Sequence, residues 1–142
     1  MNSTAILALR HYFETLTPDS LSRLGDCYAH EANFKDPFNE ARGITAVRGV
    51  FHHMFEQLVA PVFVIQECRA NDRSAVLLWE FKFFFRGKEP VTQQRFTGMS
   101  LLRFDSNDKI IDHRDDWDAA EEIYEKFPLI GPSLRWIKRR MK

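Results

Sequence analysis

Cysteine is scarce in this sequence: Cys27 and Cys68 are the two among 142 residues. They lack C-x-x-C spacing and a secretory context, so we expect reduced structural thiols rather than a disulfide. His52 and His53 are adjacent on a predicted helix and point in different directions, and no third ligand stands at a suitable spacing. The sequence therefore predicts no metal site and no cofactor.

Long apolar runs and an excess of one charge are also missing. No run reaches membrane-spanning length, and the amino terminus lacks a basic stretch followed by an apolar one, which predicts a cytoplasmic protein. Twenty basic and twenty acidic residues give a formal net charge of zero, so the overall charge does not favour nucleic acid. Without repeats or a linker, the chain is expected to fold as one domain.

Apolar spacing predicts three helices in the first 60 residues. Residues 4–16 carry apolar side chains at helical intervals. A second helix is expected to follow Thr17-Pro18-Asp19, to include Tyr28 and to end near His30. Pro37 disfavours helix at the residue before it, so the segment around it is expected to be extended. The third predicted helix lies between Gly43 and Pro61.

The apolar period then changes from helical to alternating, which is typical of strands. We predict four strands, at residues 62–69, 75–86, 91–104 and 109–118. This order predicts an α+β fold, with three N-terminal helices packed in the concave face of a curved, mostly antiparallel sheet. Residues 1–118 are expected to form this cavity domain, and residues 119–142 a basic helical extension of it.

The last predicted strand, KIIDHRDDWD, mixes apolar and ionisable side chains on one face. Alternation places Ile111, His113, Asp115 and Trp117 together, a set that suits a ligand cavity better than a core. We therefore expect His113, Asp115 and Trp117 to line a pocket for a small hydrophobic ligand. The predicted strand at residues 75–86, by the same parity, supplies aromatic walls from Trp79, Phe81 and Phe83.

This layout resembles the nuclear transport factor 2-like superfamily, and within it ketosteroid isomerase and the SnoaL-like polyketide cyclases. Tyr12 in HYFETL matches the family's oxyanion-hole tyrosine, and Asp36 in NFKDPF matches the isomerase's catalytic aspartate. Trp117 matches the tryptophan that closes the isomerase pocket. The resemblance covers about residues 5–119. It implies a cone-shaped α+β barrel and a homodimer formed through the sheet.

Two positions depart from relatives of this fold. Ser100 stands where the isomerase has a second oxyanion-hole acid, and we retain it as a pocket residue. Gly98 and Ser100 stand where epoxide hydrolases of the fold carry Arg and Asp. Both steroid isomerisation and epoxide hydrolysis are therefore disfavoured.

Two carboxylates on one apolar cavity suit general acid–base chemistry. We expect Asp36 and Asp115 to form this pair, His113 to relay a proton or orient Asp115, and Tyr12 to donate to a developing enolate oxygen. The predicted reaction is cofactor-independent isomerisation or cyclisation of a hydrophobic carbonyl compound. The alternative is a non-catalytic ligand-binding or dimeric scaffold module, in which Asp36 only caps a turn and His113 and Asp115 form a structural pair.

Two surfaces are expected to meet partners. Glu80, Lys82 and Gln94 lie on the sheet face predicted to contact a second copy. The tail at residues 133–142 sets an apolar stripe against five basic residues. Such an end either lies on an anionic membrane or packs its stripe on the domain or a partner subunit, and its short length favours packing.

Overall fold

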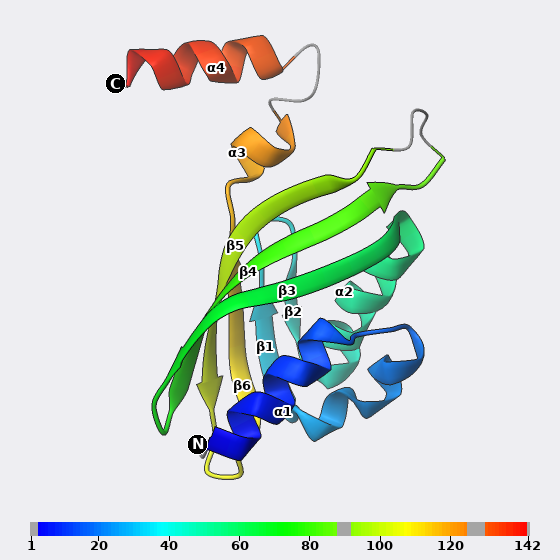
Figure 1. Ribbon diagram of the computed structural model, residues 1–142. Helices are drawn as coiled ribbons and strands as arrows, with labels where there is room; N and C mark the ends of the chain where they lie inside the picture. Colours follow the sequence, from blue (N-terminus) through cyan, green and yellow to red (C-terminus); the bar gives the residue numbers. More distant parts are fainter. Residues whose placement is uncertain (1–2, 88–91, 125–129, 142) are drawn as a thin grey trace.

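The computed structural model describes residues 3–87, 92–124 and 130–141, and Figure 1 shows their arrangement. The fold is one curved, unclosed sheet with helices packed against its concave face. The elements in chain order are α1 (Ser3–Glu14), the 3₁₀ helix η1 (Asp19–Asp26), β1 (Tyr28–Lys35), β2 (Glu40–Arg42), α2 (Ile44–Gln57), β3 (Leu58–Ala70), β4 (Ser74–Phe85), β5 (Gln94–Phe104), β6 (Ile110–Asp116), α3 (Ala119–Glu122) and α4 (Gly131–Arg140).

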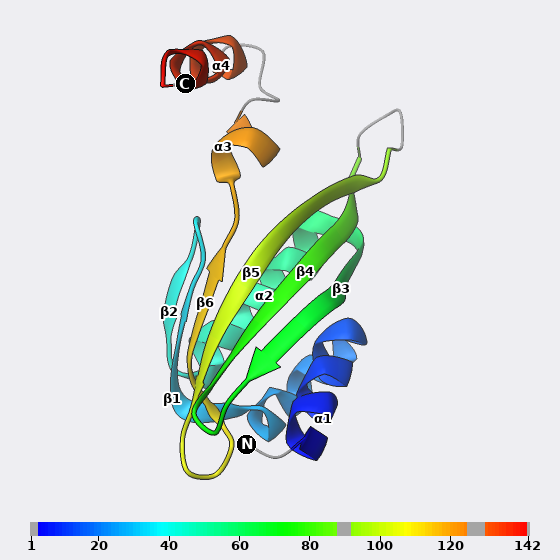
Figure 2. The same cartoon turned by 60° about the vertical axis from the view of Figure 1, so that its left-hand side comes forward.

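The sheet has six described strands in the order β2-β1-β6-β5-β4-β3. Every neighbouring pair is antiparallel except β1 and β6, which run parallel and join the first half of the chain to its last strand. In the turned view of Figure 2, the long strands β3 to β5 curve around α2. The sheet is therefore mixed, and it has two more strands than the four predicted.

The second predicted helix is shorter than expected. It is a 3₁₀ helix that ends at Asp26, whereas the sequence predicted an end near His30. Tyr28 instead begins β1, where Tyr28, Ala32 and Phe34 are buried between exposed neighbours. Pairing with β2 and β6 supplies hydrogen bonds that local propensity does not register, so tertiary context decides the conformation of this segment.

Ile111 does not share a face with His113, contrary to the predicted alternation. The register between β5 and β6 shifts between Arg103 and Phe104, so that Ile110 pairs with Phe104. Ile110 is consequently buried, and Ile111 is 40% exposed on the outer face. A bulge of this kind reverses side-chain parity on one side of it. His113 lies beyond the shift and points inward.

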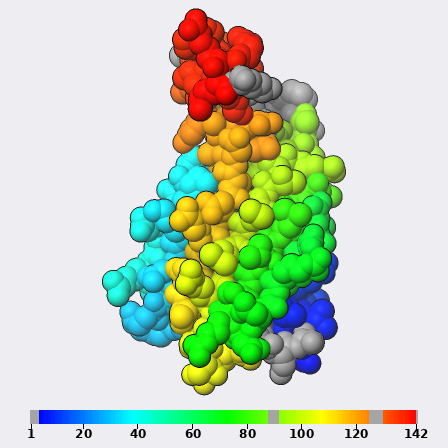
Figure 3. Space-filling view, turned by 90° about the vertical axis from the view of Figure 1, so that its left-hand side faces the viewer, coloured from blue at the N-terminus to red at the C-terminus, as the bar shows by residue number. Residues whose placement is uncertain are grey.

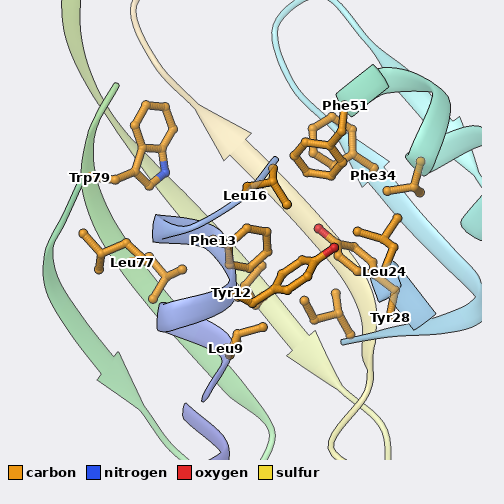
Figure 4. Packing of buried hydrophobic residues seen from close by; sticks show 14 of the residues in the cluster. Leu9, Tyr12, Phe13, Leu16, Leu24, Tyr28, Phe34, Phe51, Leu77 and Trp79 are labelled. Carbon is orange, nitrogen blue, oxygen red and sulfur yellow. The ribbon is translucent and has the colours of Figure 1, made fainter. Parts of the chain in front are cut away.

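The core lies between the hollow face of the sheet and the two long helices. Figure 4 shows residues of α1 and α2 packed with residues from the strands, Phe13 and Phe51 among them. On β4 the side chains of Leu77, Trp79, Phe81 and Phe83 are buried, as the alternating pattern predicted. The fold thus directs a row of aromatic side chains into its own concavity.

Gly98 makes room for one of these aromatic side chains. It pairs with Trp79 across β4 and β5, and a Cβ at this position would lie 2.3 Å from the indole ring. No side chain but hydrogen fits beneath the ring. The indole of Trp79 therefore lies directly over the backbone of β5, with its N–H pointing along that strand.

The tail does not bury its apolar stripe on the domain. Ile137 and Met141 are 45% and 82% exposed and Leu134 is only partly buried, so the expected packing of the stripe on this chain is not observed. Figure 1 shows α4 at the end of the molecule beyond α3, opposite the N-terminus. No helix within the described ranges is long and apolar enough to cross a membrane.

Candidate functional site

An aromatic cavity of about 330 Å³ lies between the hollow face of the sheet and α2. Its apolar wall comes from Phe34, Phe38, Phe51, Phe63, Trp79, Phe81, Phe83, Phe85, Phe96 and Trp117. Polar side chains interrupt this wall at a few places, among them Asp36, Asn39, His53, Gln57 and Asp115. A mostly apolar cavity with few polar groups is typical of a site for a small hydrophobic molecule.

Asp115 is a largely buried polar group in the wall of this cavity. This residue also borders a smaller hollow of about 20 Å³, together with Ser100 and His113. The side chain of Asp115 is 12% exposed, and that of His113 is 4% exposed. A carboxylate at this depth requires hydrogen-bond partners, because burying an unpaired charge is costly.

Those partners form a continuous chain of side chains. The indole Nε1 of Trp79 donates to Ser100 Oγ at 2.8 Å, and that hydroxyl donates to Asp115 Oδ1 at 2.5 Å. His113 Nε2 lies 2.7 Å from the same Oδ1. Among the described residues, both of these hydrogen bonds to Asp115 are made to Oδ1 and none is observed at Oδ2.

Tyr28 extends this hydrogen-bond network at the other ring nitrogen of His113. Its hydroxyl lies 2.5 Å from His113 Nδ1. Burial raises the pKa of Tyr28 well above its ordinary value, and the nearby charge of Asp115 raises it further, so the hydroxyl keeps its proton. An ionised carboxylate oxygen can only accept, so His113 Nε2 donates to Asp115, and in the neutral imidazole Nδ1 then accepts from the Tyr28 hydroxyl. His113 therefore orients Asp115.

Aromatic rings fix the position of His113. Its ring contacts Phe13 and Phe34 edge-on, at centroid distances of 5.7 and 4.9 Å, and stacks with Tyr28 at 6.0 Å. This packing restricts rotation of the imidazole about its side-chain bonds. The Tyr28–His113–Asp115 arrangement is therefore held by both packing and hydrogen bonds.

Asp36 lines the same cavity as Asp115, but it is held in a turn. Its Oδ1 accepts from the backbone N–H groups of Phe38 and Asn39, at 2.7 and 2.6 Å, and both of its oxygens contact the Asn39 amide. The side chain is half-buried at the loop between β1 and β2. These bonds match the turn-capping alternative for Asp36, and they occupy the oxygens that a base would use.

Tyr12 does not reach this cavity. Its hydroxyl donates to the backbone oxygen of Ser20 at 2.9 Å, and the residue borders a separate pocket of about 410 Å³ beside η1. Burial raises the pKa of Tyr12, with a smaller contribution from Cys27. The expected donation from Tyr12 to an enolate oxygen beside Asp115 is therefore not supported by its position.

The other predicted site residues lie where strand parity placed them. Trp79, Phe81, Phe83 and Trp117 border the cavity, and Trp117 stacks on Phe96 at 5.0 Å between ring centroids. Ser100 lies behind Asp115 and borders the smaller hollow. Within the described parts of the chain, no three His, Cys, Asp or Glu side chains are grouped as a metal site would need.

Sequence reasoning missed Tyr28 because it assigned this residue to a helix. The signal that could have found it is weak: burial alternates only from Ala32 to Lys35, where Ala32 and Phe34 are inward. The segment is short and polar at His30 and Glu31, so an alternating pattern is weak there.

Together these features define an α+β protein with a curved, unclosed mixed sheet and an internal cavity lined mostly by aromatic side chains. A family model described as a SnoaL-like domain matches residues 9–113. The chain belongs to this SnoaL-like family. Among curated proteins, the comparison finds no match.

Solved structures of the same fold span almost the whole chain. A ketosteroid isomerase-like protein from Catenulispora acidiphila, solved with trimethylamine, superposes with a TM-score of 0.70 at 13% identity, covering 87% of this chain and 92% of that one. A SnoaL-like polyketide cyclase homologue from Shewanella denitrificans superposes with a TM-score of 0.70 at 15% identity, covering 86% of this chain and 98% of that one. An LEH-like epoxide hydrolase from M. tuberculosis superposes with a TM-score of 0.68 at 14% identity, covering 94% of this chain and 96% of that one. These identities establish the fold.

Proposed function

We propose that the protein binds a small hydrophobic carbonyl compound and catalyses a proton transfer on it, with Asp115 as the general base. The observation that carries this proposal is the position of Asp115: a nearly buried carboxylate at the wall of an aromatic cavity, oriented through one oxygen while the other faces no described donor. A base placed in this way meets a ligand C–H without competition from water.

The proposed step conserves protons and needs no cofactor. Asp115 removes a proton from the carbon beside the ligand carbonyl, the C–H electron pair enters the enolate, and the same proton returns at another position of the ligand. His113 Nε2–H and the Ser100 hydroxyl hold the carboxylate during both transfers. His53 and Gln57, which border the cavity, are the candidates to hydrogen-bond the carbonyl oxygen.

Hydrogen exchange beside a carbonyl tests this proposal without knowledge of the natural ligand. We suggest 2-tetralone in D₂O, with loss of its α-proton signals followed by NMR. The protein should accelerate exchange, and Asp115→Asn should lower the acceleration by about 10²–10⁴-fold, as for loss of a general base. Binding of the ketone, followed by quenching of Trp79 and Trp117 fluorescence, should persist in the variant. Unchanged exchange by Asp115→Asn would contradict the assignment.

The alternative function is a non-catalytic module that retains the cavity. It accounts for the absence of a second free carboxylate, because Asp36 is occupied by its turn. Ketone binding by the wild-type protein without any accelerated exchange, across several aryl and bicyclic ketones, would favour this alternative.

We also propose that the protein forms a homodimer through the outer face of the sheet. Figure 3 shows this face, where β6, β5 and β4 lie side by side. Val62, Val76, Met99 and Ile111 are 44%, 40%, 51% and 40% exposed on it. Scattered apolar side chains on a broad sheet favour self-association, and a second copy would cover them.

A further inference from the structure

We propose that α4 docks on anionic membrane surfaces. Four residues one or two turns apart form its apolar stripe: Ile130, Leu134, Ile137 and Met141. On a helix their spacing places them on one side. Ile130, Ile137 and Met141 are 49%, 45% and 82% exposed, and Leu134 is partly buried, so the described chain leaves most of the stripe uncovered.

The charges of the tail point to an anionic partner. Residues 131–142 contain five basic residues and no acidic one, whereas the other 130 residues hold 15 basic and 20 acidic residues. An anionic surface therefore attracts this end of the molecule and repels the rest, which orients the protein tail first. A nucleic acid would also attract the cations, but it offers no apolar layer for Ile137 and Met141.

The helix is held in place in a way that leaves its stripe open. Lys138 pairs with Asp118 at 3.6 Å and with Glu121 at 3.2 Å, which ties α4 to α3. The Arg140 guanidinium lies over the Trp136 ring at 4.7 Å, within the same helix. A basic helix with an exposed apolar stripe and an interfacial tryptophan has the composition of helices that lie in the headgroup layer.

The position of α4 gives this docking a consequence. Asp118, which pairs with Lys138, follows Trp117 directly, and Trp117 borders the aromatic cavity. Ile123, just after α3, borders it as well. Docking through α4 therefore brings the end of the molecule that holds Trp117 and Ile123 to the membrane, where hydrophobic ligands concentrate. The docking itself does not depend on the chemistry proposed for Asp115.

Vesicle co-sedimentation of the full chain tests the proposal. The wild-type protein should sediment with vesicles of phosphatidylcholine and phosphatidylglycerol, but not with phosphatidylcholine alone, and high salt should release it. Arg139→Gln with Arg140→Gln leaves the Lys138 ion pairs intact and should weaken binding about 30-fold, since each surface cation contributes about fivefold. Ile137→Ser with Met141→Ser should also weaken binding although every charge remains.

The matched control removes the same charge at the other end of the molecule. Arg69→Gln with Arg73→Gln alters the region of the β3–β4 turn, far from α4 in Figure 1, and should leave vesicle binding unchanged. The proposal is overturned if anionic vesicles do not bind the protein, if the control weakens binding as much as the tail variant, or if the stripe variant binds normally. It is also overturned if the wild-type protein does not bind vesicles and the stripe variant has a lower molecular mass in solution than the wild type. A second copy of the chain would then cover the stripe.

Discussion

The imidazole Nε2 of His113 lies 2.7 Å from Oδ1 of Asp115, and the hydroxyl of Tyr28 is hydrogen-bonded to Nδ1, the other ring nitrogen. A donating Tyr28 hydroxyl at Nδ1 favours the tautomer in which His113 Nε2 carries the proton toward Asp115. A residue 85 positions away in sequence sets the orientation of the proposed base.

Tyr28→Phe should therefore lower both stability and ketone exchange. The variant leaves His113 Nδ1 buried without a donor, which should cost about 1–3 kcal/mol in the free energy of unfolding. Urea denaturation measures the stability, and NMR of the His113 ring shows any change of tautomer. Tyr12→Phe is the matched control, because it also loses one hydroxyl bond but in the separate pocket. If Tyr12→Phe lowers exchange and Tyr28→Phe does not, the oxyanion role implied by the family resemblance is correct instead.

Replacing each of the two cavity aspartates, Asp36 and Asp115, with asparagine should affect ketone exchange differently. Asp36→Asn retains Oδ1, which accepts from the backbone of Phe38 and Asn39, so the turn should persist and most ketone exchange should remain. Asp115→Asn should lose it. The comparison is made with both variants at equal concentration after circular dichroism shows that each is folded. Loss of exchange in Asp36→Asn alone would restore Asp36 as the base.

Gly98→Ala should destabilise the protein. The added methyl group would meet the Trp79 indole at 2.3 Å, so the ring must move and its bond to Ser100 must break. Overpacking of this kind costs typically about 1–3 kcal/mol. Gly49→Ala is the control: it lies in α2 with nothing near its added methyl group, and should stabilise the protein by up to about 1 kcal/mol. Equal denaturation midpoints for Gly98→Ala and the wild type would refute the packing argument.

Stability should decrease in alkaline solution. Burial, with a smaller contribution from the charge of Asp26, raises the pKa of Cys27 from 9.0 to about 11, and burial raises the pKa of Tyr28 well above 10.0. Above pH 9 the unfolded chain releases the Cys27 proton first, so the unfolded state binds fewer protons and the unfolding free energy falls as pH rises toward 11. Tyr28 adds to the fall above pH 10.

In Cys27→Ser, the free energy of unfolding should decrease less steeply between pH 9 and 11 than in the wild type. Urea denaturation at several pH values under reducing conditions measures this slope. Cys68→Ser should change the slope less, because Cys68 is the less buried of the two thiols. A slope that is the same in all three proteins would show that Cys27 is not responsible.

Met99→Glu should disrupt the proposed dimer. It places a carboxylate at the centre of the outer sheet face, beside Asp116, its partner on β6. The expected result is a monomer by light scattering, with the fold intact. Leu7→Glu is the control on α1, since Leu7 is also exposed, at 63%, but lies away from this face. A wild-type monomer at all concentrations would contradict the dimer proposal.

Local pattern was sufficient for the long strands. The alternation around Trp79, Phe81 and Phe83 predicted which β4 residues are buried, because a strand with one covered face must alternate. The same rule placed His113 inward and Asp115 and Trp117 at the cavity wall. The family resemblance agreed with the fold but misplaced Tyr12, since equivalent sequence positions do not guarantee equivalent side-chain contacts.

The sequence by itself determined the fold class, the aromatic concavity and the inward face of the last strand beyond its bulge, because these follow from side-chain periodicity within single elements. Only the tertiary structure decided that Tyr28 belongs to a strand, that it holds His113, that Asp36 is occupied by its own turn and that the stripe of α4 is uncovered. Each of these depends on contacts between segments far apart in the chain or on the geometry of a single loop. Periodicity within one segment carries no information about such contacts.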